Sequence, residues 1–145
     1  FEGHRKRISP HLVRAPLEAT DDALQRFYDR LLAVLRHPTV RDGDWRLLEC
    51  TAAWEGNWTS DCFVTWLWTS TAGNRRLVAV NYAANQSQCY VRVPLHALGG
   101  RSVRFKDLMG PVGTVVCDRD RGDLDARGLF LDVPAWGYHV FDVTA

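Results

Sequence analysis

Two tryptophans enclose polar residues in the segment Ala53-Trp54-Glu55-Gly56-Asn57-Trp58, which is expected to form a loop. An indole ring stacks on the apolar face of a sugar, and adjacent amide and carboxylate groups hydrogen-bond to the sugar hydroxyls. Trp54, Trp58, Asn57 and Glu55 are therefore the candidate carbohydrate-binding residues. The alternative is that both indoles fold back as a lid over one edge of the domain, and of the two interpretations we favour the lid.

Motifs for other chemistry are missing or incomplete. The sequence has no G-x-S-x-G and no phosphate-binding glycine loop. The aspartates from Asp118 to Asp125 have a spacing that suits Ca²⁺, but Gly122 takes the fifth loop position and Leu129 the place of the bidentate glutamate. We interpret this run as a solvated hairpin turn and His139 as a satisfied or surface histidine. We therefore assign no catalytic residue, no metal ligand and no cofactor.

The four cysteines, Cys50, Cys62, Cys89 and Cys117, are widely spaced and lie in apolar, strand-like stretches. That spacing does not fit a zinc site. Buried free thiols behave as small hydrophobic groups, so we expect a reduced compartment, the bacterial cytoplasm. One bridge, from Cys62 to Cys89, is the alternative.

Composition indicates a globular domain. The 145 residues suit one domain, and 46% hydrophobic and 24% charged residues are close to the globular average. Eighteen basic and seventeen acidic side chains give a net charge of +1, which argues against nucleic acid and membrane surfaces as partners. The sequence opens on Phe1 rather than Met, so we expect a piece of a longer chain.

One amphipathic helix is expected near the start of the chain. Residues 1–19 are irregular, and Thr20 is a plausible N-cap for a helix over 20–38 that Pro38 ends. Its apolar stripe includes Leu24, Phe27, Leu31 and Leu35. We expect this stripe to face a partner surface. Without that partner, it would pack on the flank of the sandwich or on a second copy of the chain, as a homodimer.

From Trp45 onward the hydrophobic period changes to two. The period predicts an antiparallel β-sandwich of Greek-key type over 39–145. Segment 62–69 is bulky on both faces and is expected to be an interior strand, and Trp66, Trp68 and Trp136 are expected in the core. About eight strands are predicted, at 45–50, 62–69, 76–83, 88–93, 102–107, 113–118, 128–133 and 136–143.

The order of these elements resembles the end of an α-amylase-family enzyme. Segment 27–43 has an aromatic-Tyr-x-x-Leu pattern and a basic-Pro exit, Phe27-Tyr28 to Leu31 and then His37-Pro38 to Gly43, similar to the last helix of that family's catalytic barrel. Segment 1–14 looks like the stretch after the last barrel strand. The C-terminal domain of the family is resembled by three further motifs: the strand ending in Asn81-Tyr82, the turn Asp107-Leu108-Met109-Gly110, and the hairpin around Pro134-Ala135-Trp136-Gly137.

The resemblance implies a glycoside hydrolase of family 13 as the parent, which would cleave α-glucosidic bonds by the retaining, two-carboxylate route. The family's catalytic acids lie on earlier barrel strands that this sequence does not contain, so none is carried over. The chain would then be the non-catalytic C-terminal β-sandwich that caps and stabilises the parent's barrel, with α-glucan as a further ligand. The alternatives are a self-standing carbohydrate-binding module that binds α-glucans through exposed tryptophans, and an unrelated interaction sandwich.

Overall fold

The computed structural model describes residues 19–96, 98–110 and 116–145. Of the irregular segment predicted over 1–19, all but the last position lies outside the described residues. The first part of the strand predicted at 113–118 also lies outside them.

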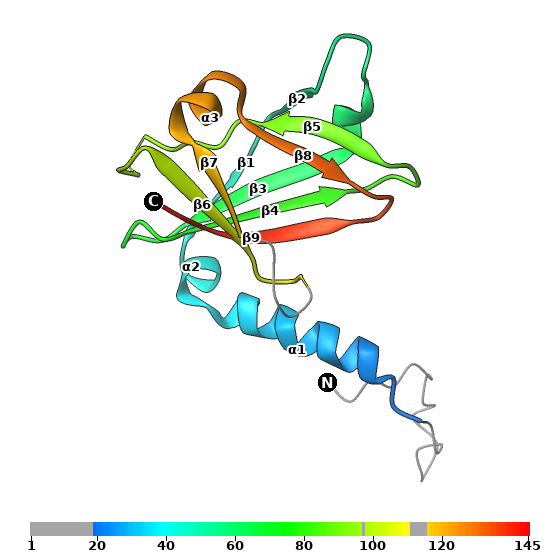
Figure 1. The fold of residues 1–145 in the computed structure, drawn as a ribbon. Coiled ribbons are helices and arrows are strands. Elements are labelled where there is room, and N and C mark those ends of the chain that lie inside the picture. Colours follow the sequence, from blue (N-terminus) through cyan, green and yellow to red (C-terminus); the bar gives the residue numbers. More distant parts are fainter. Residues whose placement is uncertain (1–18, 97, 111–115) are drawn as a thin grey trace.

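Two antiparallel sheets form the body of the molecule (Figure 1). The larger sheet has the order β1-β3-β4-β9-β6-β7 and the smaller the order β2-β5-β8. The predicted mainly β fold, an antiparallel sandwich behind one amphipathic helix, is confirmed. The large sheet contains β1 (Asp44–Leu47), β3 (Phe63–Thr69), β4 (Arg75–Asn81), β9 (Tyr138–Thr144), β6 (Ser102–Asp107) and β7 (Val116–Asp120). The small sheet contains β2 (Cys50–Ala52), β5 (Ser87–Val91) and β8 (Leu129–Val133).

The strand predicted at 45–50 is in fact two strands in different sheets. β1 pairs with β3 as far as Leu47, and β2 begins at Cys50 opposite Val91 of β5. Between them the Leu48 side chain inserts into the core, and its N–H donates to Thr65 O. Burying Leu48 draws the chain across from one sheet to the other.

The predicted hairpin turn at 118–125 is wrong, because residues Arg121–Arg127 form the helix α3. Asp120 is its N-cap and accepts a hydrogen bond from Asp123 N–H. Leu124 points into the core, and Gly128 ends the helix at φ 89°. The aspartates that resembled a cation loop therefore cap and flank a short helix that closes one end of the sandwich.

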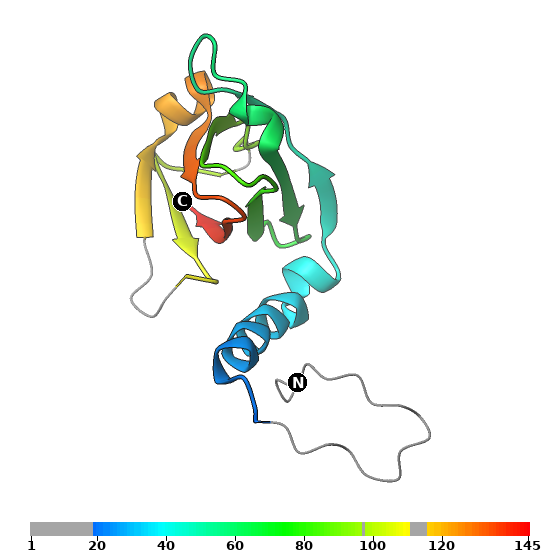
Figure 2. The same ribbon diagram turned by 90° about the vertical axis from the view of Figure 1, so that its right-hand side faces the viewer.

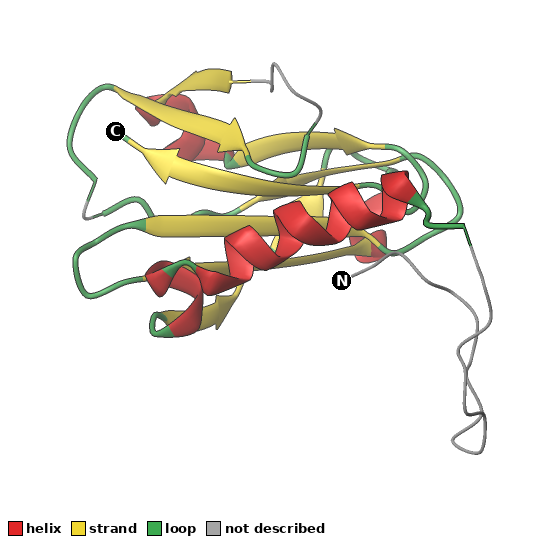
Figure 3. Ribbon diagram, turned by 90° about the horizontal axis from the view of Figure 1, so that it is seen from below, coloured by secondary structure: helices red, strands yellow, loops and turns green. Residues whose placement is uncertain are grey.

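Helix α1 (Asp22–Arg36) begins one residue later than predicted, because Asp21 rather than Thr20 accepts the hydrogen bond from Leu24 N–H. Pro38 lies just beyond its end and starts a second short helix, α2 (Pro38–Arg41). Figures 2 and 3 show α1 lying across the large sheet, on the side away from the small one.

The apolar stripe of α1 meets the outer face of the large sheet. Phe27, Leu31 and Val34 pack against a cluster that includes Val78 of β4 and Val140 of β9. The flank of the sandwich is therefore the surface that receives the helix. Leu35, at the end of the predicted stripe, stays exposed.

The main core lies between the two sheets. β3 lies between β1 and β4, as its two bulky faces predicted. On β8 the inward positions are buried and the outward ones exposed, in agreement with the hydrophobic period of two predicted from Trp45 onward. The largest fully buried side chains include Phe105, Leu77, Leu129, Val91 and Val103.

The three tryptophans expected in the core lie elsewhere. Trp66 and Trp68 are half-buried and pack in the outer cluster beneath α1, with their rings edge to face. Trp136 is exposed, because it lies in the turn before β9 rather than within a strand.

Candidate functional site

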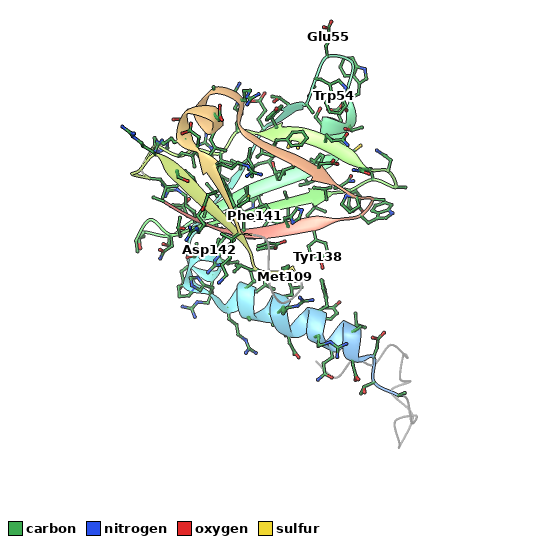
Figure 4. The ribbon with its side chains drawn as sticks, viewed as in Figure 1. Trp54, Glu55, Met109, Tyr138, Phe141 and Asp142 are labelled. Atoms are coloured by element: carbon green, nitrogen blue, oxygen red, sulfur yellow. The ribbon has the colours of Figure 1, made fainter. Side chains whose placement is uncertain are left out.

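The loop between β2 and the short 3-10 helix η1 (Thr59–Cys62) carries the predicted carbohydrate-binding residues. Trp54 is 56% exposed and Trp58 78% exposed. Figure 4 shows Trp54 and Glu55 at the tip of this loop, well away from the sheets. The expectation that both indoles form a lid over the sandwich is therefore wrong, because neither ring is buried against the fold.

Asn57 has a different place from its neighbours. Its side chain is buried, and its Oδ1 accepts hydrogen bonds from Thr59 N–H at 2.9 Å and Thr59 Oγ1 at 2.6 Å. Its Nδ2 donates to Gln88 Oε1 of β5 at 3.4 Å. Asn57 anchors the loop to the small sheet, whereas Trp54, Glu55 and Trp58 face solvent.

A second pair of exposed aromatic rings was missed in the sequence. Tyr82, just after β4, and Trp136, just before β9, are exposed, with ring centroids 5.6 Å apart and ring planes at 89°. The signal was present in the Pro134-Ala135-Trp136-Gly137 turn and in the Tyr that follows Asn81. The strand predicted at 136–143 began two residues before β9 does, so Trp136 was expected in the core although it lies in a loop.

The outer face of the small sheet is polar beside these rings. Gln86 and Gln88 both donate through Nε2 to Asp132 Oδ1, at 2.7 Å and 3.0 Å. Tyr90 and Phe130 lie on the same face, with ring centroids 5.4 Å apart. This face combines aromatic surface with amide and carboxylate groups.

His139 forms the main titratable pair of the large sheet. Its Nδ1 lies 2.8 Å from Asp107 Oδ2, and its ring stacks on Phe141 at 5.0 Å between centroids. Burial opposes the charge on Asp107, but hydrogen bonds from His139 and from the N–H groups of Met109 and Val140 outweigh it, so the pKa of Asp107 is lowered. His139 is thus a satisfied histidine, as predicted.

The four cysteines are free thiols, so the alternative of a Cys62–Cys89 bridge is not found. A hydrogen bond with Cys89 is the main cause that lowers the pKa of Cys50 to about 7, and the same bond together with burial raises the pKa of Cys89. Among the described residues, no group of three or more His, Cys, Asp or Glu side chains is placed to hold a metal ion.

No family model matches the chain, and no curated protein matches its sequence. In the part of the chain that the structure describes, no helix has the length and apolar character needed to cross a membrane. The α-amylase resemblance stays a prediction.

Proposed function

We propose that this chain is the non-catalytic C-terminal β-sandwich domain of an α-amylase-type glycosidase, and that it caps and stabilises the catalytic barrel of its parent. The supporting observation is the outer face of the large sheet, which is largely apolar from β1 to β9 and is interrupted by the ion pair of Arg76 with Asp142. A sheet whose two faces are both apolar needs a covering layer on each side.

Helix α1 covers only part of that face. It packs over Val78 and Val140, on β4 and β9. Toward the β1 edge, Trp45 and Leu47 pair with Trp68 and Trp66 of β3 and so lie on the same outer face. Both are 58% exposed, and Val64 of β3 is 44% exposed. A group of large apolar side chains left in water marks an interaction surface.

We name Trp45, Leu47 and Val64 the β1 edge patch. It lies on the same outer face as the residues that α1 covers. Under this proposal, α1 would be the last helix of the barrel. A barrel docked on this patch would complete the cover that α1 begins. The chain itself would not hydrolyse α-glucosides, because a retaining mechanism needs two carboxylates about 5–5.5 Å apart across the bond. Among the described residues the buried carboxylate is Asp107, and it pairs with His139 instead.

The test uses the open reading frame that encodes this chain. We expect it to encode a barrel upstream, and we expect the barrel expressed alone to melt at a higher temperature when the purified chain is added in trans. The variant Leu47→Asp should abolish this stabilisation, and the matched control Phe130→Asp, on the outer face of the small sheet, should retain it. Turnover of a chromogenic α-glucoside by the isolated chain, or equal stabilisation by both variants, would contradict the proposal.

A second candidate is a carbohydrate-binding role for the Trp54–Trp58 loop, favoured by the exposure of both indoles. Because Trp58 is not packed in the core, Trp58→Ala should leave the melting curve nearly unmoved and should abolish retention on an amylose or β-cyclodextrin affinity gel. A melting temperature lowered as in a core truncation, which costs about 3–5 kcal/mol, would instead show that the ring is structural.

A further inference from the structure

Two loops at one end of the sandwich bring Tyr82 and Trp136 together. Residues 82–86 join β4 to β5, and residues 134–137 join β8 to β9. Tyr82 is 73% exposed and Trp136 59% exposed, yet their rings contact each other at a right angle. The two rings form an open corner, which we name the aromatic corner.

Hydrogen bonds hold both loops in place. Tyr82 N–H donates to Cys62 O at 2.7 Å, and Trp136 N–H donates to Ala83 O at 3.0 Å. Asn81, which is fully buried, donates through Nδ2 to Asn85 O in one loop and to Val133 O and Pro134 O beside the other. The aromatic corner is therefore pre-formed, so a ligand would not have to order it.

The backbone at Trp136 is strained. Its φ is 57°, in the left-handed region that bulky residues rarely adopt. Gly137, next to it, has little room for a side chain, since a Cβ there would lie 2.7 Å from Val133 Cγ1. A large ring that stays mostly exposed while its backbone is held in a strained conformation gains little from burial, so its position points to contact with a ligand.

The surroundings of the aromatic corner select for an uncharged, hydroxyl-rich ligand. The two loops, Tyr-Ala-Ala-Asn-Gln and Pro-Ala-Trp-Gly, contain no charged side chain. Gln86, at the end of the first loop, hydrogen-bonds to the exposed carboxylate of Asp132. One ring face, one ring edge, and nearby amide and carboxylate groups match the faces and hydroxyls of a pyranose.

We propose that the aromatic corner is a carbohydrate-binding site for a neutral oligosaccharide. A sugar ring stacks on Trp136 or Tyr82, and its hydroxyls reach Asn85, Gln86 and Asp132. The site differs from the Trp54–Trp58 loop and uses none of its residues. It also needs no catalytic partner, because all of its groups belong to this chain.

The test uses the whole chain, titrated with maltoheptaose and with cellohexaose and followed by calorimetry and by amide NMR shifts. Trp136→Gly removes the ring at a position whose φ suits glycine, so the fold should be retained with an unchanged melting temperature. We expect this variant to lose at least tenfold in affinity for the sugar that binds, and Tyr82→Ser to lose a similar factor. The control Trp45→Ser, on the β1 edge patch, should bind as wild type.

Three outcomes would overturn this inference. The first is that neither oligosaccharide shifts the amides of residues 82–86 or 134–137. The second is that Trp136→Gly and Tyr82→Ser bind as wild type while Trp58→Ala does not, which would assign the sugar to the Trp54–Trp58 loop alone. The third is that a proline-rich peptide, which also docks on exposed aromatic rings, binds at the corner while both sugars fail.

Discussion

The two sheets of the sandwich share one core but differ on their outer faces. The outer face of the large sheet holds Trp66, Trp68, Val78 and Val140, and α1 covers the part over β4 and β9. The outer face of the small sheet holds Gln88 and Asp132, which hydrogen-bond to each other, and Tyr90 and Phe130, whose rings are in contact. The same fold therefore presents one outer face that is largely apolar and one that is polar and open to water.

The burial patterns of individual strands show this difference. β4 is buried at six of its seven positions, because its residues face the core on one side and α1 on the other. β8 alternates between buried and exposed positions, because only one of its faces is covered. A strand that is buried on both faces thus has a second covering layer, and a strand with alternating burial has one open face.

The largest difference in stability between the two sheets is expected when a charge is placed on the outer face of each. Val78→Asp would bury an unpaired carboxylate beneath α1, so we expect a loss of about 4 kcal/mol in the free energy of unfolding. Phe130→Asp places the same charge on an exposed face and loses a ring contact with Tyr90, for about 1 kcal/mol. Urea denaturation of both variants measures the difference. Equal losses would mean that the two outer faces are equally covered.

Shortening an apolar side chain of α1, the helix that covers part of the large sheet, should have an intermediate effect on stability. Phe27 is half-buried against the large sheet, so Phe27→Ala should cost about 2 kcal/mol, less than a fully buried phenylalanine. The matched variant Leu35→Ala, at an exposed position of the same helix, should stay within about 0.5 kcal/mol of wild type. Thermal melts check both values. If Phe27→Ala were neutral, α1 would contribute no stability to the sandwich.

The smallest difference in stability is expected when one carboxylate on each sheet is replaced by an amide. For Asp107 this difference also depends on pH. Asp107→Asn removes a buried charge that accepts hydrogen bonds from Met109 N–H and Val140 N–H and pairs with His139, at a cost of about 1–2 kcal/mol near neutral pH. Asp132→Asn, at an exposed position, should cost no more than about 0.5 kcal/mol.

The lowered pKa of Asp107 fixes the direction of the pH dependence. A carboxylate with a depressed folded pKa stabilises the fold fully above its unfolded pKa, about 3.9, and loses this contribution as the pH falls through the folded pKa. The gap between wild type and Asp107→Asn should therefore shrink as the pH falls from about 4 through the folded pKa of Asp107. Urea midpoints measured across that range check it, and a gap that grows in acid would reverse the assignment.

The sequence predicted the features that depend on periodicity. A local period of apolar residues, about 3.6 for a helix and two for a strand, marks each of them. They are the helix with its apolar stripe, the interior strand 62–69 and the strand 128–133. The features that depend on tertiary contacts were missed. Nothing local in 45–50 shows that Leu48 crosses between sheets, and the aspartates of 118–125 look like a turn until Leu124 is seen buried.

The candidate site divides in the same way. Tryptophans beside polar residues indicated an exposed surface at Trp54 and Trp58, but the structural task of Asn57 follows from Gln88, thirty-one positions further along the chain. The aromatic corner joins Tyr82 to Trp136 across two separate loops, so the sequence can place each ring in a turn but cannot show that the two rings meet.

The place of β9 has a consequence for the order in which the protein is made. β9 lies between β4 and β6, so it alone joins the strands β1, β3 and β4 to the pair β6 and β7. Every other described strand precedes it in the chain. During synthesis, α1 can pack early on the outer face of β3 and β4. The large sheet, however, stays in two parts until β9, which ends at Thr144, has left the ribosome. Until that moment the unpaired edges of β4 and β6 are open to any other strand, and a chaperone that binds extended apolar segments would find its target there.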